Sequence, residues 1–137
     1  MPRILAIDYG ARRTGLAWTD PMQIIATGVG TVDTARLHET LARYVATEDI
    51  EAFVLGFPTR LDGSDTHVTQ DVRDLAAHLQ QQYPGRPVHL WDERFSSAQA
   101  MRAMIDSGVK QKQRRDKQLI NEVSAVLILQ GFMEQRG

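Results

Sequence analysis

The sequence has no cysteine and no long uncharged apolar run. Without cysteine the chain cannot form a disulfide, a cysteine-ligated zinc site or an iron–sulfur cluster. No apolar stretch approaches the roughly 18 residues that cross a membrane, so we expect a soluble, unprocessed cytoplasmic protein without membrane contacts. Its 137 residues, 42% of them hydrophobic, predict one domain over residues 1–137 that buries its own core.

The chain also lacks a large excess of charge of either sign. Sixteen Lys and Arg residues face seventeen Asp and Glu residues, and the net charge of −1 argues against a nucleic-acid binder held by bulk charge. The charge is nevertheless segregated. Residues 110–117 hold five basic residues and one acidic residue, which gives +4, while eleven basic and sixteen acidic residues elsewhere give −5.

Apolar runs and turn residues predict three strands before the first helix. Five runs indicate strands, at residues 3–7, 15–19, 24–32, 52–57 and 87–91. Apolar residues at helical spacing predict four helices, over residues 37–45, 68–83, 98–105 and 116–135. Thr34 is a candidate N-cap of the first helix. The order β-β-β-α-β-α-β-α-α implies an α/β structure in which helices pack on a mixed five-stranded sheet.

Acidic residues follow two of the predicted strands. Asp8 comes directly after the first strand, and Glu93 follows the fifth, next to Asp92. Sites in such sheets gather at the C-terminal ends of parallel strands, and carboxylates there suit Mg²⁺. Paired divalent ions can clamp the attacking and leaving oxygens of a phosphoryl displacement. Each acid also fits a turn cap or a solvated ion pair, and strand alternation alone leaves open whether Asp92 or Glu93 faces the site.

Four ordered segments resemble the conserved blocks of the YqgF/RuvX family. They are Asp8-Tyr-Gly-Ala-Arg-Arg-Thr-Gly15, Gly56-Phe-Pro-Thr-Arg-Leu-Asp-Gly-Ser64, Asp92-Glu-Arg-Phe-Ser-Ser97 and Ala125-Val-Leu-Ile-Leu-Gln130. That family is described as Holliday-junction-resolvase-like, with members described as nucleases that trim precursor 16S ribosomal RNA. The resemblance covers nearly the whole chain. It implies an RNase H-like fold and metal-dependent phosphodiester cleavage by acidic residues.

The resemblance implies three acidic catalytic positions, two of which match. Asp8 and Glu93 stand at the first two and are the implied metal ligands, whereas Asn121 stands where the family has Asp. An amide oxygen can still ligate Mg²⁺ but brings no negative charge, so a second metal would be held more weakly. Glu122 is adjacent but lies about 100° further around the helix. Asn121 also fits a capping role near a helix start.

Basic residues occur in two places that suit phosphate contacts. Arg12 and Arg13 lie between Gly10 and Gly15, which let the backbone turn tightly and approach a phosphate. The second group precedes or opens the last helix, where backbone N–H groups also favour anions. It consists of Lys110, Lys112, Arg114, Arg115 and Lys117. No aromatic residues interleave them, so we expect salt-sensitive backbone contacts rather than base stacking, with a solvated charge run as the alternative.

Together with the resemblance, these features predict a Mg²⁺- or Mn²⁺-dependent nuclease acting on structured nucleic acid, with 5′-end processing of precursor 16S ribosomal RNA as its role. A Holliday-junction or branched-DNA resolvase and a binding module that has lost hydrolysis are the alternatives. A sugar-kinase or actin-like module also opens with a strand and Asp-x-Gly, but this chain is too short for two lobes. The apolar last helix and the exposed-looking Trp18 and Trp91 permit a monomer or a homodimer.

Overall fold

The computed structural model describes residues 2–57, 68–92 and 114–136, the last range with side chains from residue 121 onward. The elements in chain order are β1 (Arg3–Asp8), β2 (Arg13–Thr19), β3 (Ala26–Asp33), the 3-10 turn η1 (Thr34–Arg36), α1 (Leu37–Thr47), β4 (Ile50–Phe57), α2 (Thr69–Gln82), β5 (Val88–Asp92) and α4 (Arg114–Arg136). The helix predicted over residues 98–105 lies outside the described residues.

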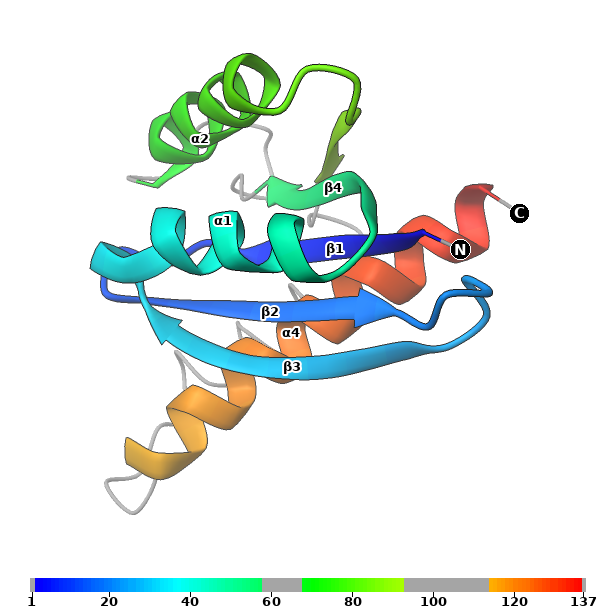
Figure 1. The fold of residues 1–137 in the computed structure, drawn as a ribbon. Helices are drawn as coiled ribbons and strands as arrows, with labels where there is room; N and C mark the ends of the chain where they lie inside the picture. Colours follow the sequence, from blue (N-terminus) through cyan, green and yellow to red (C-terminus); the bar gives the residue numbers. More distant parts are fainter. Residues whose placement is uncertain (1, 58–67, 93–113, 137) are drawn as a thin grey trace.

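The five strands form one mixed sheet in the order β3-β2-β1-β4-β5. β1 and β2 are antiparallel, as are β2 and β3, whereas β1, β4 and β5 run parallel. α1 and α2 cover one face of the sheet and α4 covers the other (Figure 1). The predicted α/β layer structure with a mixed five-stranded sheet is confirmed. None of the helices in the described ranges is long and apolar enough to cross a membrane.

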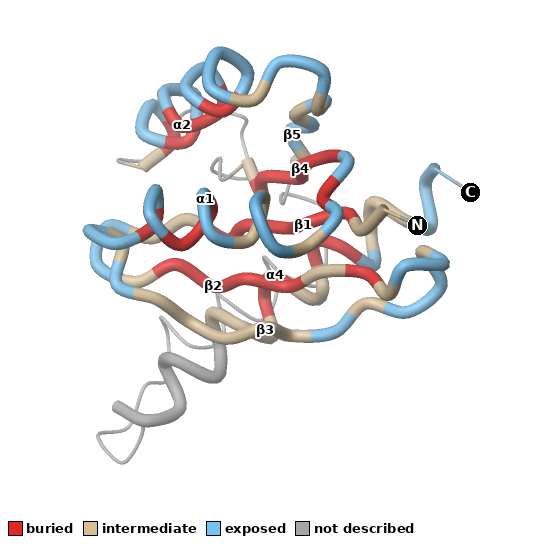
Figure 2. The backbone as a smooth tube through the Cα atoms, in the orientation of Figure 1, coloured by how far each residue is buried: buried red, intermediate tan, exposed pale blue. Residues whose placement is uncertain are grey.

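Alternation along the strands divides the core into two clusters. Leu5 and Ile7 of β1 pack with α1 and α2, whereas Ile4 and Ala6 pack with α4. Figure 2 shows that burial is concentrated in the central strands and at their contacts with the helices. Asp8 continues the alternation of Ile4 and Ala6, so it lies on the face that α4 covers.

α4 lies directly on two glycines of the sheet, with its backbone against one and a side chain against the other. A Cβ atom on Gly15 of β2 would overlap the backbone carbonyl of Asn121. One on Gly28 of β3 would overlap the side chain of Glu122. Gly15 is the cross-strand partner of Asp8. The close approach of α4 to the sheet therefore sets the position of Asn121 relative to Asp8.

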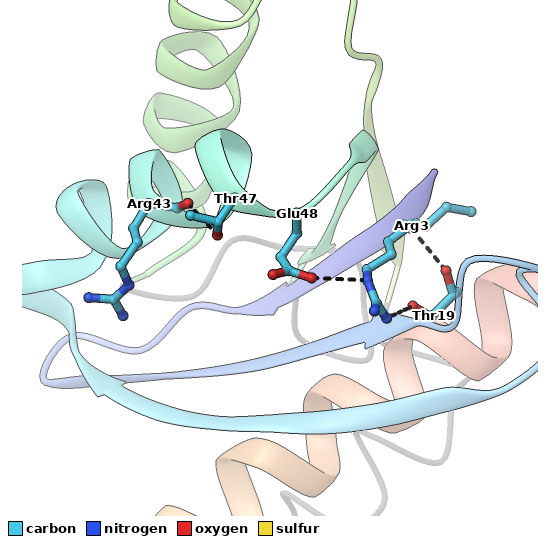
Figure 3. Close-up of polar contacts among 6 residues, drawn as sticks. Arg3, Thr19, Arg43, Thr47 and Glu48 are labelled. Atoms are coloured by element: carbon cyan, nitrogen blue, oxygen red, sulfur yellow. Dashed lines mark hydrogen bonds and ion pairs between the residues drawn. The ribbon is translucent and has the colours of Figure 1, made fainter. Parts of the chain in front are cut away.

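Arg3 ties three elements together at the other end of the sheet (Figure 3). Its Nη1 donates to the carbonyl of Thr19 at 3.0 Å, and its Nε lies 3.4 Å from Oε1 of Glu48, directly after α1. The hydroxyl of Thr47 donates to the carbonyl of Arg43 at 2.9 Å and closes the last turn of α1. The start of β1, the end of β2 and the end of α1 are thus joined by polar contacts.

The prediction that Thr34 caps the first helix is wrong. α1 has Arg36 at its N-cap position, without a side-chain hydrogen bond. The hydroxyl of Thr34 instead donates to the carbonyl of Gly10 at 2.6 Å. Because that bond uses its one proton, Thr34 accepts from the hydroxyl of Thr14, 2.9 Å away. Thr34 therefore serves the turn between β1 and β2 rather than the helix.

The expectation that Trp18 and Trp91 are exposed is wrong, because both are partly buried. Trp18 packs edge-on against Tyr44, with ring centroids 5.2 Å apart, and the guanidinium of Arg3 lies 4.8 Å from its ring. Trp91 packs on Gly131 of α4. The two rings lie on opposite faces of the sheet, where each extends one of the two core clusters.

A histidine pair joins the two helices on one face of the sheet. His38 of α1 and His78 of α2 have ring centroids 4.3 Å apart. Burial, and then the neighbouring His78, lower the pKa of His38 below its ordinary value. Folding thus favours the neutral form of His38 over the protonated form.

We expect α4 to resist any side chain at Gly15. Gly15→Ala should lower the free energy of unfolding by about 1–3 kcal/mol, because the obstructing neighbour is the backbone of Asn121 and cannot rotate away. Gly28→Ala is the matched control and should cost less, since the side chain of Glu122 can turn aside. Urea unfolding of both variants measures the difference. Equal stability of Gly15→Ala and the wild type would contradict the close approach.

We expect acidification to weaken the contact between α1 and α2. The unfolded chain binds a proton on His38 more readily than the folded chain, so this stability contribution is present above about pH 6.5 and lost as the pH falls through the lower folded pKa. His38→Gln should therefore lose less stability than the wild type between about pH 7.5 and about pH 5.5, measured by urea unfolding. His78→Gln, which leaves the burial of His38 in place, should reduce the pH dependence by a smaller amount. Identical slopes for His38→Gln and the wild type would refute the assignment.

Candidate functional site

The C-terminal ends of three parallel strands meet at one edge of the sheet. β1 ends at Asp8, β4 at Phe57 and β5 at Asp92, and the register pairs Phe57 with Asp92. Asn121 reaches the same edge, because its backbone lies on Gly15, the cross-strand partner of Asp8. The structure thus brings together two of the three predicted catalytic positions. Glu93, the third, lies outside the described residues.

Asp8 is buried at the end of a strand. Its exposed fraction is 4%, and its place in β1 puts it on the face covered by α4. A carboxylate is rarely buried this far without charged groups, hydrogen-bond donors or a metal close by, because desolvation penalises the ionised form. A buried acid at the sheet edge where this class of fold binds its ligands is the strongest single mark of a functional site in the described residues.

Asn121 and Glu122 lie over different strands. The backbone of Asn121 lies on β2, next to β1, while the side chain of Glu122 lies against Gly28 of β3, one strand further from Asp8. The rotation of about 100° per helical residue produces this divergence. The carboxylate of Glu122 is thus directed over the outer strand, and Asn121 is the residue placed over the pair formed by β1 and β2.

Strand alternation shows on which face of the sheet Asp92 lies. Val88 packs with the core cluster of α1 and α2, while Trp91 packs with that of α4. Asp92 shares the alternation of Val88 and Leu90, so it lies on the opposite face of the sheet from Asp8. The sequence left open whether Asp92 or Glu93 faces the site. The structure shows that Asp92 lies on the other face of the sheet from Asp8.

The turn between β1 and β2 carries the first pair of basic residues. Arg12 is exposed in the turn, and Arg13 begins β2 on the same face as Asp8. Thr34 holds this turn, because its backbone N–H donates to the carbonyl of Arg12 at 2.9 Å and its hydroxyl donates to Gly10. A guanidinium at the start of β2 thus stands on the same face and at the same edge as the buried carboxylate.

The glycines at the two ends of this segment lie close to other parts of the chain. The space above Gly15 is taken by the backbone of Asn121, and a Cβ atom on Gly10 would overlap the carbonyl of Arg13. Both glycines therefore allow close packing within the chain, and a phosphate contact at this turn stays a prediction.

The second basic group falls partly in the described structure. Arg114, Arg115 and Lys117 belong to the first turn of α4. Lys110 and Lys112 lie outside the described residues. The first turn of a helix presents unpaired backbone N–H groups, which favour anions.

Tyr9 is a residue at this edge that the sequence did not single out. It follows Asp8 and packs against the cluster of α1 and α2. Burial, and then the charge of Asp71, raise the pKa of Tyr9 above its usual value. The phenol consequently stays neutral at physiological pH, and it adds no negative charge beside Asp8.

The donor atoms at this edge are oxygens. No three His, Cys, Asp or Glu side chains in the described ranges come together as a metal site. Of the predicted catalytic residues, the structure describes Asp8, which carries a carboxylate, and Asn121, which carries an amide. Glu93 lies outside the described residues. A buried carboxylate together with an amide oxygen fits a hard divalent cation such as Mg²⁺ or Mn²⁺ rather than a soft metal.

Comparison with known proteins agrees with the fold. A family described as "RuvX: Holliday junction resolvase" matches residues 2–135. A protein of Porphyromonas gingivalis is 46% identical over 134 residues, covering 98% of this chain and 97% of its own length. A protein of Parabacteroides distasonis is 41% identical over 136 residues, covering 99% and 97%. One of Flavobacterium johnsoniae is 42% identical over 136 residues, covering 99% of each. All three are named as candidate pre-16S rRNA nucleases.

The family match runs from β1 to all but the last residue of α4. The mixed five-stranded sheet with helices on both faces agrees with the RNase H-like fold that the resemblance implied. The chain belongs to the RuvX family.

Proposed function

We propose that this chain is a metal-dependent nuclease that hydrolyses phosphodiester bonds in structured nucleic acid, and that it processes the 5′ end of precursor 16S ribosomal RNA. The observation that carries the proposal is the buried Asp8 at a sheet edge, with Asn121 placed over its cross-strand partner. Family membership and the names of the relatives support a nucleic-acid substrate.

Asp8, Glu93 and Asn121 are the residues that would hold Mg²⁺ or Mn²⁺. When bound, divalent ions at such a site activate a water nucleophile and stabilise the charge that develops on the phosphate. Asp8 contributes a charged oxygen whose direction is fixed by β1, and Asn121 contributes a neutral oxygen from α4. Because Asn121 carries no charge, this site attracts its cations less strongly than one with three acids.

The basic residues bind the phosphates of the substrate on either side of the reacting bond. Arg13 shares the face of Asp8, Arg12 is exposed in the adjoining turn, and α4 begins with further cations. Guanidinium groups bind phosphate oxygens through paired N–H donors and hold the backbone in register. These contacts read charge and shape rather than base sequence.

Branched DNA is the second candidate substrate, because the matching family is described as a Holliday junction resolvase. A labelled 5′ precursor fragment of 16S ribosomal RNA and a labelled four-way DNA junction, each with Mn²⁺, distinguish the two. Cleavage confined to the junction would replace ribosomal RNA by branched DNA in the proposal.

We expect Asp8→Asn to abolish metal-dependent cleavage. Removing the charged oxygen at the strand end should reduce the single-turnover rate by at least about 100-fold, with substrate binding by the basic residues retained. Glu122→Gln is the control and should stay within about two-fold of wild type, because Glu122 lies over β3. The nuclease proposal would be refuted if the wild type and every variant bound the substrate but showed no metal-dependent cleavage. The chain would then be a nucleic-acid-binding module.

We expect Asn121→Asp to strengthen the site. An added charge beside Asp8 should raise the cleavage rate at limiting Mn²⁺ by about ten-fold or more and lower the Mn²⁺ concentration needed for half-maximal rate. Titration of Mn²⁺ against rate measures both. An unchanged titration curve would mean that another acid already supplies the third charge.

We expect the opening turn of α4 to contribute to binding through charge alone. Arg114→Gln and Arg115→Gln should each reduce the slope of log binding constant against log salt concentration by about one, for RNA and DNA alike. Fluorescence anisotropy at several salt concentrations measures the slope. A slope unchanged in the double variant would show that these side chains are solvated and do not bind the substrate.

A further inference from the structure

The loop between β2 and β3 presents large apolar side chains to solvent. In this loop, residues 20–25, here called the hairpin tip, Met22, Ile24 and Ile25 are 60%, 68% and 62% exposed. Leu90 of the edge strand β5, at 47%, is the other large hydrophobic side chain exposed in the described ranges. Scattered apolar residues are normal on a surface, but three within four positions of one loop form a patch.

The carboxylate of Asp20 closes the hairpin tip through hydrogen bonds to the backbone. It accepts hydrogen bonds from the backbone N–H groups of Met22 at 2.9 Å, Ile24 at 2.8 Å and Ile25 at 2.6 Å. The same bonds, led by that from Ile25, hold the pKa of Asp20 below its usual range, so the carboxylate stays charged. Gln23 adopts a φ of 58°, a left-handed conformation that is uncommon for a residue with a side chain.

The side chain of Gln23 anchors the hairpin tip to the body of the protein. Its Nε2 donates to the carbonyl of Pro2 at 2.9 Å and to Oε1 of Glu51, and its Oε1 accepts from Nη1 of Arg136 at 2.8 Å. The side chain of Gln23 is thus turned toward the body of the protein, while Met22, Ile24 and Ile25 are exposed. A rigid apolar projection binds a partner with little loss of conformational entropy.

A pocket of about 840 Å³ opens beside the hairpin tip. It is lined by β5, the start of β4 and the last turns of α4, and its aromatic lining includes His89, Trp91 and Phe132. The rings of His89 and Phe132 lie 4.9 Å apart. Glu51 and Arg136 belong both to this lining and to the contacts of Gln23. The pocket and the hairpin tip therefore adjoin.

We propose that the pocket of one chain receives the hairpin tip of a second copy, and the reverse, in a two-fold symmetric dimer. One chain carries an apolar projection and an apolar recess side by side, and a two-fold axis passing between them would seat each tip in the other chain's pocket. Leu90, which is exposed, also belongs to the lining of this pocket.

Charge favours a second copy over nucleic acid at this surface. The hairpin tip brings the carboxylate of Asp20, and the pocket brings Arg136 and His89 to meet it. A polyanion would instead face the carboxylates of Asp20 and Glu51.

The dimer does not rest on the proposed function, because its surface lies at the end of the sheet away from Asp8. The tip joins the end of β2 to the start of β3, beside the start of β1 and the end of α4, whereas Asp8 and the start of α4 lie at the other end (Figure 1). In the dimer, the sheet edge that carries Asp8, here called the active edge, stays open to solvent in both chains.

Sedimentation equilibrium tests the proposal on the full chain. The wild type should approach twice its 15.4 kDa monomer mass as its concentration rises from about 1 µM to about 1 mM. Ile24→Asp in the tip and Leu90→Asp in the pocket should each weaken association by at least about ten-fold. Gln80→Asp, on the exposed face of α2, is the matched control and should associate as the wild type does. A wild type that stays monomeric throughout this range would overturn the proposal.

Mixing the variants tests whether the tip meets the pocket. An equal mixture of Ile24→Asp and Leu90→Asp chains forms one intact contact per mixed dimer, so it should associate more strongly than either variant alone. Circular dichroism verifies folding, and Gln135→Trp, which blocks the pocket from the exposed end of α4, replaces Leu90→Asp if that variant unfolds. The tip-in-pocket arrangement would be overturned if mixing brought no gain in association. It would also be overturned if the tip variant weakened association while the pocket variant did not, which would indicate a tip-to-tip contact or another partner.

Discussion

The structure depends on the contact between the backbone of α4 and Gly15 of β2. At Gly15 the helix backbone meets the strand directly, so no change of side-chain rotamer can relieve an added methyl group. This one contact places Asn121 beside the strand pair that carries Asp8 and turns Glu122 toward β3. It also seats Ile128 in the second core cluster. The active edge is therefore positioned by packing of the main chain, with hydrogen bonds of Thr34 holding the adjoining turn.

The two ends of the sheet have different characters. The C-terminal ends of the parallel strands carry Asp8 and the turn with Arg12 and Arg13, and we assign this end to the substrate. The other end is closed by Arg3 and Gln23, whose polar groups point inward and leave apolar groups on the surface. α4 runs between them, and its 23 residues correspond to about 35 Å of helix. The proposed catalytic edge and the proposed dimer surface thus lie toward opposite ends of one helix.

Much of the fold could be predicted from the sequence because its strands are apolar runs bounded by turn residues. The mixed sheet and the position of Asp8 at a strand end followed from that pattern. The choice between Asp92 and Glu93 required the register of β5, since a shift of one residue exchanges the faces. The partners of Thr34 and the contact of His38 with His78 join residues distant in sequence, so no local pattern reveals them. Local signals such as an Asp-Pro turn show that a loop exists, but not which way its apolar side chains face.

The side chain of Gln23 bridges the two described ends of the chain. Its amide contacts the carbonyl of Pro2 on one side and the guanidinium of Arg136 on the other. Any polypeptide joined to either end therefore emerges beside the hairpin tip and far from Asp8. A purification tag at either end competes for the surface that we assign to dimerisation, while the active edge stays unobstructed. A circular permutant that joins the two ends and opens the chain elsewhere frees this surface from flanking polypeptide.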